Sequence, residues 1–256
     1  MEPVFRTLEI IAHGLVRAQG LDLRIDDEDN LPRTGGVVLA INHTSYVDFL
    51  PAAIGVYRAG RRVRYMIKAE TMKYGIMRFL IKHTKTVPVD RLAGADAYRQ
   101  AVQTLRDGEV VAVYPEATIS RSFELKAFKT GAVRMAHDAN VPIVPCIVWG
   151  AHRQWTKGHE RAMGRTGLPV HVRFGPALTV DGDVQTGTDR LRTAMQDLLS
   201  TVQAGYGPHP AREFWVPASM GGGAPTLAEA DRLDTEEQAR RAAARAGRET
   251  SGDDAA

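Results

Sequence analysis

His43 and Asp48 are the two residues whose types and spacing most directly indicate chemistry. They follow the apolar run Val37–Ile41, which has the composition of a buried strand. A histidine titrates near neutrality and can accept a proton, while a carboxylate bonded to its other ring nitrogen fixes the tautomer and stabilises the imidazolium. An isolated His-x4-Asp match is common by chance, and Asp48 could simply complete a helix cap. The rest of the sequence must decide between these interpretations.

The five-residue offset also predicts where the pair lies. On one continuous helix two such positions are about 140° apart, which is poor geometry for a hydrogen bond. We therefore expect His43 in a loop and Ser45 as the N-cap of a helix, with Asp48 at its third position and able to reach back. Free N–H groups at Ser45 or Tyr46 could then stabilise an oxyanion.

Three further blocks follow in order along the chain. They are Val87-Pro-Val-Asp90-Arg91, Val113-Tyr-Pro-Glu116-Ala117-Thr118-Ile119-Ser-Arg121 and Val141-Pro-Ile-Val-Pro145. Arg91 ends a short apolar strand and suits a phosphate, because a planar guanidinium donates two hydrogen bonds at once. A surface ion pair is the alternative for Arg91. Lys68, near the end of the preceding predicted strand, is a weaker candidate for the same anion.

Together the four blocks resemble the glycerolipid acyltransferase family, which includes 1-acylglycerol-3-phosphate O-acyltransferases, over about residues 36 to 150. The resemblance implies transfer of a fatty acyl group from acyl-CoA or acyl carrier protein to a lysophospholipid hydroxyl in membrane phospholipid biosynthesis. The acceptor most directly implied is 1-acylglycerol-3-phosphate, giving phosphatidic acid. It makes His43 and Asp48 catalytic and assigns Arg91, Glu116 and Thr118 to the acceptor. We expect no acyl-enzyme, cofactor or metal.

The third block departs from the family pattern Phe-Pro-Glu-Gly-Thr-Arg-Ser at two positions. Ala117 stands where the family has glycine, and Ile119 stands where it has arginine. The missing guanidinium removes a charge-assisted contact worth about 1.5–3 kcal/mol. Either Arg121, two residues on, compensates for this loss, or the acceptor is a lysophospholipid with a larger head group whose phosphodiester carries less charge.

Composition narrows the cellular setting. The 256 residues include one cysteine, which excludes an internal disulfide and a cysteine-built metal site. No apolar run approaches the length that spans a bilayer, and the N-terminus lacks a signal-peptide pattern. We expect a peripheral protein on the cytoplasmic side of the cell membrane, while the sequence leaves the oligomeric state open.

The net charge of +3 is unevenly distributed, because Lys and Arg are concentrated between Arg58 and Arg91. Such a stretch favours an anionic partner: a membrane surface, a phosphorylated substrate or nucleic acid. Nucleic acid is disfavoured because the basic residues alternate with large apolar ones at helical spacing and no recognised nucleic-acid motif accompanies them. A solvated basic face without a partner remains the alternative.

Apolar periodicity predicts an α/β domain with a central, mixed but largely parallel sheet flanked by helices. An N-terminal amphipathic helix is expected over residues 4–17. The predicted strands are residues 37–42, 62–67, 86–89, 110–114, 143–149 and 170–174, and the predicted helices are residues 46–57, 72–82, 94–106 and 126–138. We expect one acyltransferase domain over residues 1–206 and a partly disordered C-terminal extension over residues 207–256.

Two other functions are compatible with these residues. A thioester hydrolase would use the same histidine and aspartate on water. A non-catalytic module that keeps the fold would use only the basic surface, for membrane docking.

Overall fold

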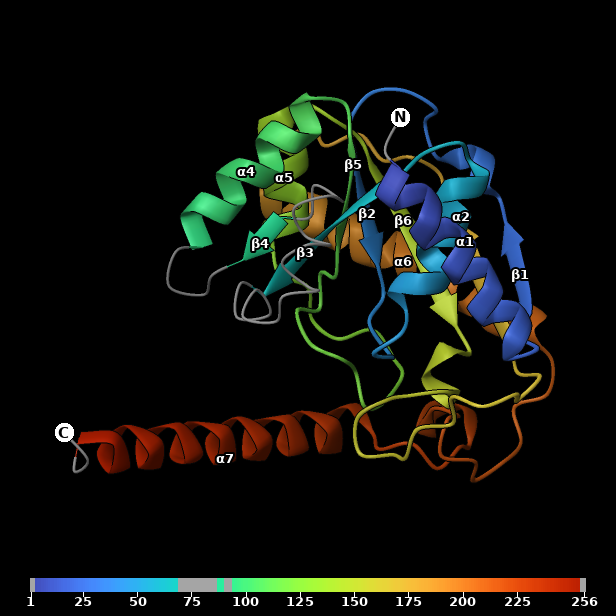
Figure 1. The fold of residues 1–256 in the computed structure, drawn as a ribbon, viewed down its shortest axis with the longest axis vertical. Helices are drawn as coiled ribbons and strands as arrows, with labels where there is room; N and C mark the ends of the chain where they lie inside the picture. The colour runs from blue at the N-terminus through green and yellow to red at the C-terminus, as the bar shows by residue number, and fades with distance from the viewer. Residues whose placement is uncertain (1–2, 69–86, 90–93, 254–256) are drawn as a thin grey trace. The chain divides into compact units, whose positions relative to one another are not determined.

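The computed structural model describes residues 3–68, 87–89 and 94–253. Its described strands form one sheet in the order β1-β7-β6-β2-β5-β3-β4 (Figure 1). They are β1 (Asp22–Asp26), β2 (Val37–Ile41), β3 (Val63–Lys68), β4 (Val87–Val89), β5 (Val110–Val113), β6 (Ile143–Trp149) and β7 (Pro169–Phe174). Neighbouring strands are parallel except β6 and β7, which are antiparallel. The predicted mixed, largely parallel sheet is confirmed.

Helices cover both faces of this sheet (Figure 1). The elements are α1 (Pro3–Ala18), α2 (Phe49–Arg58), α4 (Gly94–Arg106), α5 (Gly131–Ala139) and α6 (Val184–Tyr206). Helix α1 packs on α2, and α2 contacts β3, β6 and β7, while α5 and α6 pack together and α5 also contacts α4. The N-terminal amphipathic helix is confirmed within one residue at each end.

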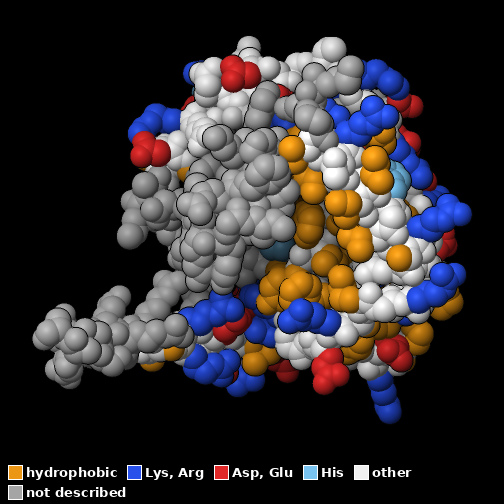
Figure 2. Space-filling view, viewed as in Figure 1, with side chains coloured by type: hydrophobic (Ala, Val, Ile, Leu, Met, Phe, Trp, Pro, Cys, Tyr) orange, Lys and Arg blue, Asp and Glu red, His pale blue; other side chains and the backbone are white. Residues whose placement is uncertain are grey.

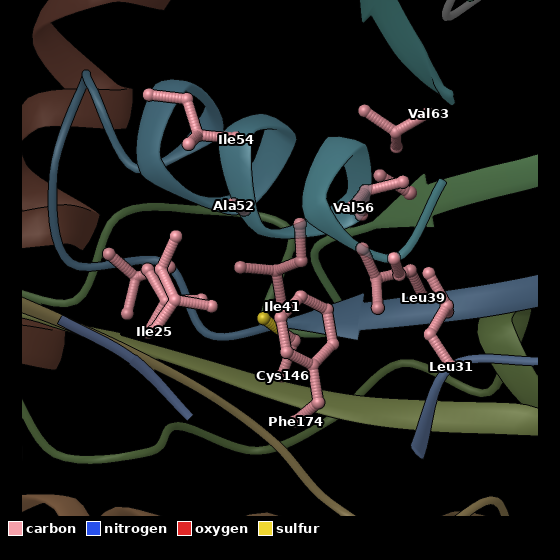
Figure 3. Close-up of a cluster of buried hydrophobic side chains, with 14 of the residues drawn as sticks. Ile25, Leu31, Leu39, Ile41, Ala52, Ile54, Val56, Val63, Cys146 and Phe174 are labelled. Carbon is pink, nitrogen blue, oxygen red and sulfur yellow. The ribbon is translucent and has the colours of Figure 1, made fainter. Parts of the chain in front are cut away.

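The hydrophobic core beneath α2 holds the central strands in place (Figure 3). Leu39 and Ile41 of β2 point into it, and both are fully buried. Helix α2 lies close to β7 at Gly55, where an added Cβ would stand only 2.7 Å from the Phe174 ring. Because β2 and β6 are buried on both faces, they are nearly continuous apolar runs, as expected for interior parallel strands.

The chain divides into two compact units. The first contains residues 1–119 and 127–207, and the second contains residues 120–126 and 208–256. In the second unit, α7 (Leu227–Asp253) follows a short 3-10 turn at Ala218–Met220. Lys126 pairs with Asp231 and Asp234 of this helix at 3.0 and 2.7 Å. The C-terminal region therefore contains a long helix with ion-pair partners at residues 120–126, a connection that no sequence pattern indicated.

Two elements of the first unit were not predicted. Strand β1 is a short edge strand, Asp-Leu-Arg-Ile-Asp, in which charged and apolar residues alternate. Helix α6 has a clear start signal, because the Asp183 side chain accepts the Thr186 N–H at 2.9 Å. Helix α5 begins at Gly131 rather than at the predicted residue 126. The predicted helix at residues 72–82 lies outside the described residues.

Three arginines of the basic stretch are bound to the protein itself. Arg61 donates to the backbone carbonyls of Pro32, Gly35 and Gly108. Arg62 pairs with a glutamate of α1 at 2.9 Å, and Arg64 forms a two-pronged pair with a glutamate before β5. These guanidiniums stabilise the fold, so the described part of the stretch offers an outside anion less charge than its sequence suggested.

Apolar side chains gather on the face formed by α1 and α2 (Figure 2). The large exposed ones there are Ile10, Ile11 and Leu15 of α1 with Phe49 and Tyr57 of α2. Among the described helices, none combines the length and the apolar character that crossing a membrane requires.

Candidate active site

Asn42 anchors the site to the sheet at the carboxyl end of β2. Its side chain donates to the Val148 carbonyl at 3.0 Å and accepts the Val148 N–H at 2.7 Å. Asn42 is fully buried, so this paired bond continues the β2–β6 ladder by one step through a side chain. The loop that follows, residues 42–48, is called the catalytic loop below.

Replacing Asn42 with alanine should destabilise the protein. Two buried backbone groups of Val148 would lose their partners, and each unsatisfied group costs about 1–3 kcal/mol, so the free energy of unfolding should fall by about 2–4 kcal/mol. Urea denaturation followed by circular dichroism measures this change. Gln185→Ala, which removes an exposed amide on α6, is the control. An equal loss of unfolding free energy in both variants would show that the bonds between Asn42 and Val148 do not stabilise the fold.

His43 and Asp48 meet within the catalytic loop. His43 Nδ1 lies 3.3 Å from Asp48 Oδ2, which confirms the predicted contact. The aspartate is fully buried, while the histidine side chain is 22% exposed. No described residue hydrogen-bonds to Nε2 of His43, so this nitrogen is available to a substrate. The arrangement provides a proton acceptor oriented from its far side by a carboxylate.

Asp48 also organises the loop backbone. The same Oδ2 accepts the N–H groups of Thr44 and Ser45 at 2.8 and 2.7 Å. Burial raises the pKa of Asp48 above its ordinary value, while the bonds from His43 and these two N–H groups act in the opposite direction. The carboxylate therefore holds both the imidazole and the loop that carries it.

The predicted start of the helix was wrong by three residues. Helix α2 begins at Phe49 with Asp48 as its N-cap, and the side chain of Asp48 turns back into the loop instead of capping the helix. Ser45 does not cap α2. Its hydroxyl donates to the Trp155 carbonyl at 2.7 Å and accepts the Val47 N–H. The five-residue offset works because the chain between the pair is a tight loop.

The proposed oxyanion donors in this loop are also not free. The Ser45 N–H is bonded to Asp48, and the Tyr46 N–H donates to the Trp155 carbonyl at 3.1 Å. An N–H group already committed to a buried acceptor is a poor donor to a developing charge. We therefore withdraw these two groups as oxyanion stabilisers.

Glu116 and Tyr114 bring the third sequence block against the histidine. Glu116 Oε1 accepts the backbone N–H of His43 at 2.8 Å, and the glutamate is buried. The ring of Tyr114 stacks on the imidazole, with centroids 4.1 Å apart. The β2–β5 pairing places the ends of these two parallel strands side by side, so residues 73 positions apart meet at one edge of the sheet.

Residues 151–157 support the catalytic loop from the other side. The turn begins at Gly150, whose φ of 96° and close approach to the Pro169 carbonyl exclude a side chain. Besides the bonds to Trp155, Thr156 Oγ1 donates to the Thr44 carbonyl at 2.7 Å. Tyr46 packs on the Trp155 ring. This 151–157 segment was not predicted to take part, because its partners are more than 100 residues away in the sequence.

Thr118 and Lys157 form a contact at the same edge. Lys157 Nζ donates to Thr118 Oγ1 at 2.8 Å, and both side chains are half-buried. The turn before Thr118 places Ala117 at a φ of 58°, a left-handed conformation that favours glycine. Ile119, where the family pattern has arginine, is a buried core residue with 4% exposure.

The remaining predicted site residues fall in different places. Arg121 belongs to the second unit, where its guanidinium is bound by Asp234 and Glu237 at 3.1 and 2.9 Å. Two carboxylates already balance its charge, so we leave it out of the proposed site. Arg91 lies outside the described residues, as does the side chain of Lys68.

The described residues form neither a reactive cysteine site nor a metal-binding cluster. Cys146 lies in the core, and burial raises the pKa of its thiol far above the ordinary value, which keeps it protonated and unreactive. Across the described ranges, no group of three His, Cys, Asp or Glu side chains is arranged to hold a metal ion. The site consists of a histidine base with an aspartate, a glutamate and a lysine–threonine pair.

A histidine base at a strand end, oriented by an aspartate five residues on, can activate a hydroxyl or a water for attack on a carbonyl. The model of the acyltransferase family matches residues 22–149, which include both side chains. The chain belongs to the acyltransferase family. In this acyltransferase the matched region contains β1 to β6 and all four sequence blocks in full.

Two relatives agree with this membership. The acyltransferase is 29% identical over 129 residues to the 1-acyl-sn-glycerol-3-phosphate acyltransferase of Bacillus subtilis, covering 50% of this chain and 63% of the relative. It is 30% identical over 151 residues to a probable enzyme of the same name from Mycoplasma pneumoniae, covering 56% of each. The chain thus spans less than two thirds of these relatives' length.

The fold matches the crystal structure of the 1-acyl-sn-glycerophosphate acyltransferase of Thermotoga maritima. The TM-score is 0.64 at 19% identity, over 77% of this chain and 82% of the other. At that identity the comparison establishes a shared fold, while the acceptor must be argued from the site of this acyltransferase.

Proposed function

We propose that this acyltransferase moves a fatty acyl group from an acyl thioester to the free hydroxyl of 1-acylglycerol-3-phosphate, giving phosphatidic acid and a thiol. The observation that carries the proposal is the His43–Asp48 contact of 3.3 Å, with the far nitrogen of the imidazole unbonded by described residues. Family membership and the printed names of the relatives support the substrate class.

In the proposed reaction, Nε2 of His43 takes the proton of the acceptor hydroxyl as its oxygen attacks the thioester carbonyl. The C–O bond forms, the C–S bond breaks, and the imidazolium returns the proton to the departing thiolate. Asp48 stabilises the imidazolium while it exists. Because the acyl group passes directly between substrates, no side chain of the enzyme needs to carry it.

The acceptor site is proposed to lie where the third block meets the histidine. Glu116 fixes the backbone of His43, and Thr118 lies two residues further on. Arg91 and Lys68 remain proposed phosphate ligands that lie outside the described side chains. The exposed apolar side chains of α1 and α2 support work at a membrane surface, where a lysophospholipid resides.

Purified protein incubated with oleoyl-CoA or oleoyl acyl carrier protein and a panel of lysophospholipids in mixed vesicles tests this function, with products identified by mass. We expect phosphatidic acid from 1-acylglycerol-3-phosphate, and the two donors compared side by side show which carrier is used. Thioester loss that is equally fast without any lysophospholipid would identify a hydrolase. Faster transfer to a phosphodiester acceptor would show that the natural acceptor has a larger head group. If no thioester is consumed, the protein is a non-catalytic docking module.

A further inference from the structure

Thr118 connects the catalytic base to a cation. The carboxylate of Glu116 holds the backbone of His43, and the hydroxyl of Thr118, two residues later, accepts a hydrogen bond from Lys157 at 2.8 Å. A hydroxyl that accepts from an ammonium group still has its own hydrogen to donate, and the ammonium places a positive charge beside it. The pair can therefore offer an anion one O–H donor and a neighbouring positive charge.

The charge balance of this edge calls for such a cation. Glu116 brings a negative charge beside His43, and Asp48 brings another behind it. A phosphate monoester would be repelled by these carboxylates unless a positive charge lay close to it. Ile119 is buried and uncharged, while Arg121 is bound by two carboxylates of the second unit. Within the first unit, the Lys157 side chain brings a positive charge into contact with the third block.

The position of Lys157 is set by the catalytic loop itself. The preceding residue, Thr156, is bonded to the Thr44 carbonyl at 2.7 Å, and Trp155 receives both the Ser45 hydroxyl and the Tyr46 N–H. These bonds place the lysine backbone against the loop that carries His43. In 1-acylglycerol-3-phosphate the phosphate is on the carbon next to the reacting hydroxyl, so the two must bind close together.

We propose that Lys157, together with Thr118, binds the phosphate monoester of the acceptor and so selects a monoester over a phosphodiester head group. This inference rests on the proposed function and deepens it, because it names the residues that recognise the acceptor. A monoester carries more negative charge than a phosphodiester and therefore gains more from a fixed ammonium group. Lys157 comes from the 151–157 segment, which lies beyond the region that the family model matches.

The test compares Lys157→Met with Lys129→Met, which removes an equal charge from an exposed side chain. With 1-acylglycerol-3-phosphate as acceptor, Lys157→Met should raise the acceptor KM about 10- to 100-fold, as expected for a lost charged hydrogen bond. The KM for the acyl donor should stay unchanged, and so should the KM for a lysophosphatidylglycerol acceptor within about threefold. Lys157→Arg should recover most of the loss because it restores the charge.

Thr118→Val removes the same contact from its other side and leaves the 151–157 segment intact, so it covers the case in which Lys157→Met folds poorly. Its acceptor KM should also rise, and melting curves confirm that each variant is folded. A Lys157→Met variant whose acceptor KM matches that of Lys129→Met overturns the inference, as does a rise confined to the donor KM, which would assign the cation to the donor phosphates. Wild-type protein that transfers no acyl group to any lysophospholipid overturns the proposed function as well.

Discussion

Replacing His43 with alanine should lower the rate of acyl transfer by about 10²–10⁴-fold, because a positioned general base contributes that much to a proton-transfer step. The reaction requires a group that takes the hydroxyl proton, and Nε2 of His43, to which no described residue hydrogen-bonds, is placed to do so. Initial rates with saturating thioester and lysophospholipid, read by product mass, measure the effect. The acceptor KM should change little, since the imidazole acts on the hydroxyl and not on the phosphate.

The fold of this variant should be retained. The His43 side chain is part-exposed, and its backbone N–H, which bonds Glu116, is kept in alanine. His137→Ala on α5 removes an exposed histidine and serves as the matched control, with activity expected to equal wild type. If His43→Ala and His137→Ala transfer acyl groups equally fast, His43 is not the base and the dyad is rejected.

Two substitutions of Asp48 should separate its role in catalysis from its contribution to stability. Asp48→Asn keeps an oxygen that can accept the N–H groups of Thr44 and Ser45, but it cannot balance an imidazolium, so transfer should fall by about 10²-fold or more while the fold is kept. Asp48→Ala removes that acceptor, and each buried N–H left unsatisfied costs about 1–3 kcal/mol, so this variant should also be less stable. Rates and urea denaturation of both proteins measure the two effects.

The pH dependence of stability gives a second readout for Asp48. Burial raises its pKa in the folded protein above the unfolded value, so the protonated acid is favoured by folding. The stability that this preference contributes is present below the unfolded pKa and is lost as pH rises through the folded pKa. Wild type should therefore lose stability relative to Asp48→Asn as pH rises above the unfolded carboxyl pKa of about 4.

Asp189→Asn, an exposed carboxylate on α6, should show no such difference from wild type across this range. A wild-type protein that instead gains stability over Asp48→Asn as pH rises would mean that the bonds to His43, Thr44 and Ser45 outweigh burial. Asp48→Asn with wild-type activity would reduce the aspartate to a loop acceptor.

The sheet was predictable because its interior strands carry a local signal. Strands β2 and β6 are buried on both faces, and a continuous apolar run specifies such a strand without knowledge of its neighbours. Strand β1 was missed for the opposite reason. It lies at the edge of the sheet, and its alternation of charged and apolar residues covers only five positions, too few to specify a strand without its parallel pairing with β7.

For the site, the sequence by itself determined the His43–Asp48 pair, because both side chains belong to one short loop whose spacing is visible in the chain. The tertiary structure decided which backbone N–H groups of the loop already donate hydrogen bonds. The Ser45 and Tyr46 N–H groups, free by sequence, are bonded to Asp48 and to Trp155.

Tertiary structure also decided where the charges lie. Arg121 belongs to the third block in sequence but pairs with Asp234, 113 residues away, whereas Lys157 reaches Thr118 across 39 residues. A hydrogen bond depends on a separation of about 3 Å in space. Sequence distance says nothing about that separation once the chain leaves one strand or loop. The chemistry of the histidine base was therefore readable from the sequence, while the cation proposed to recognise the acceptor emerged only from the fold.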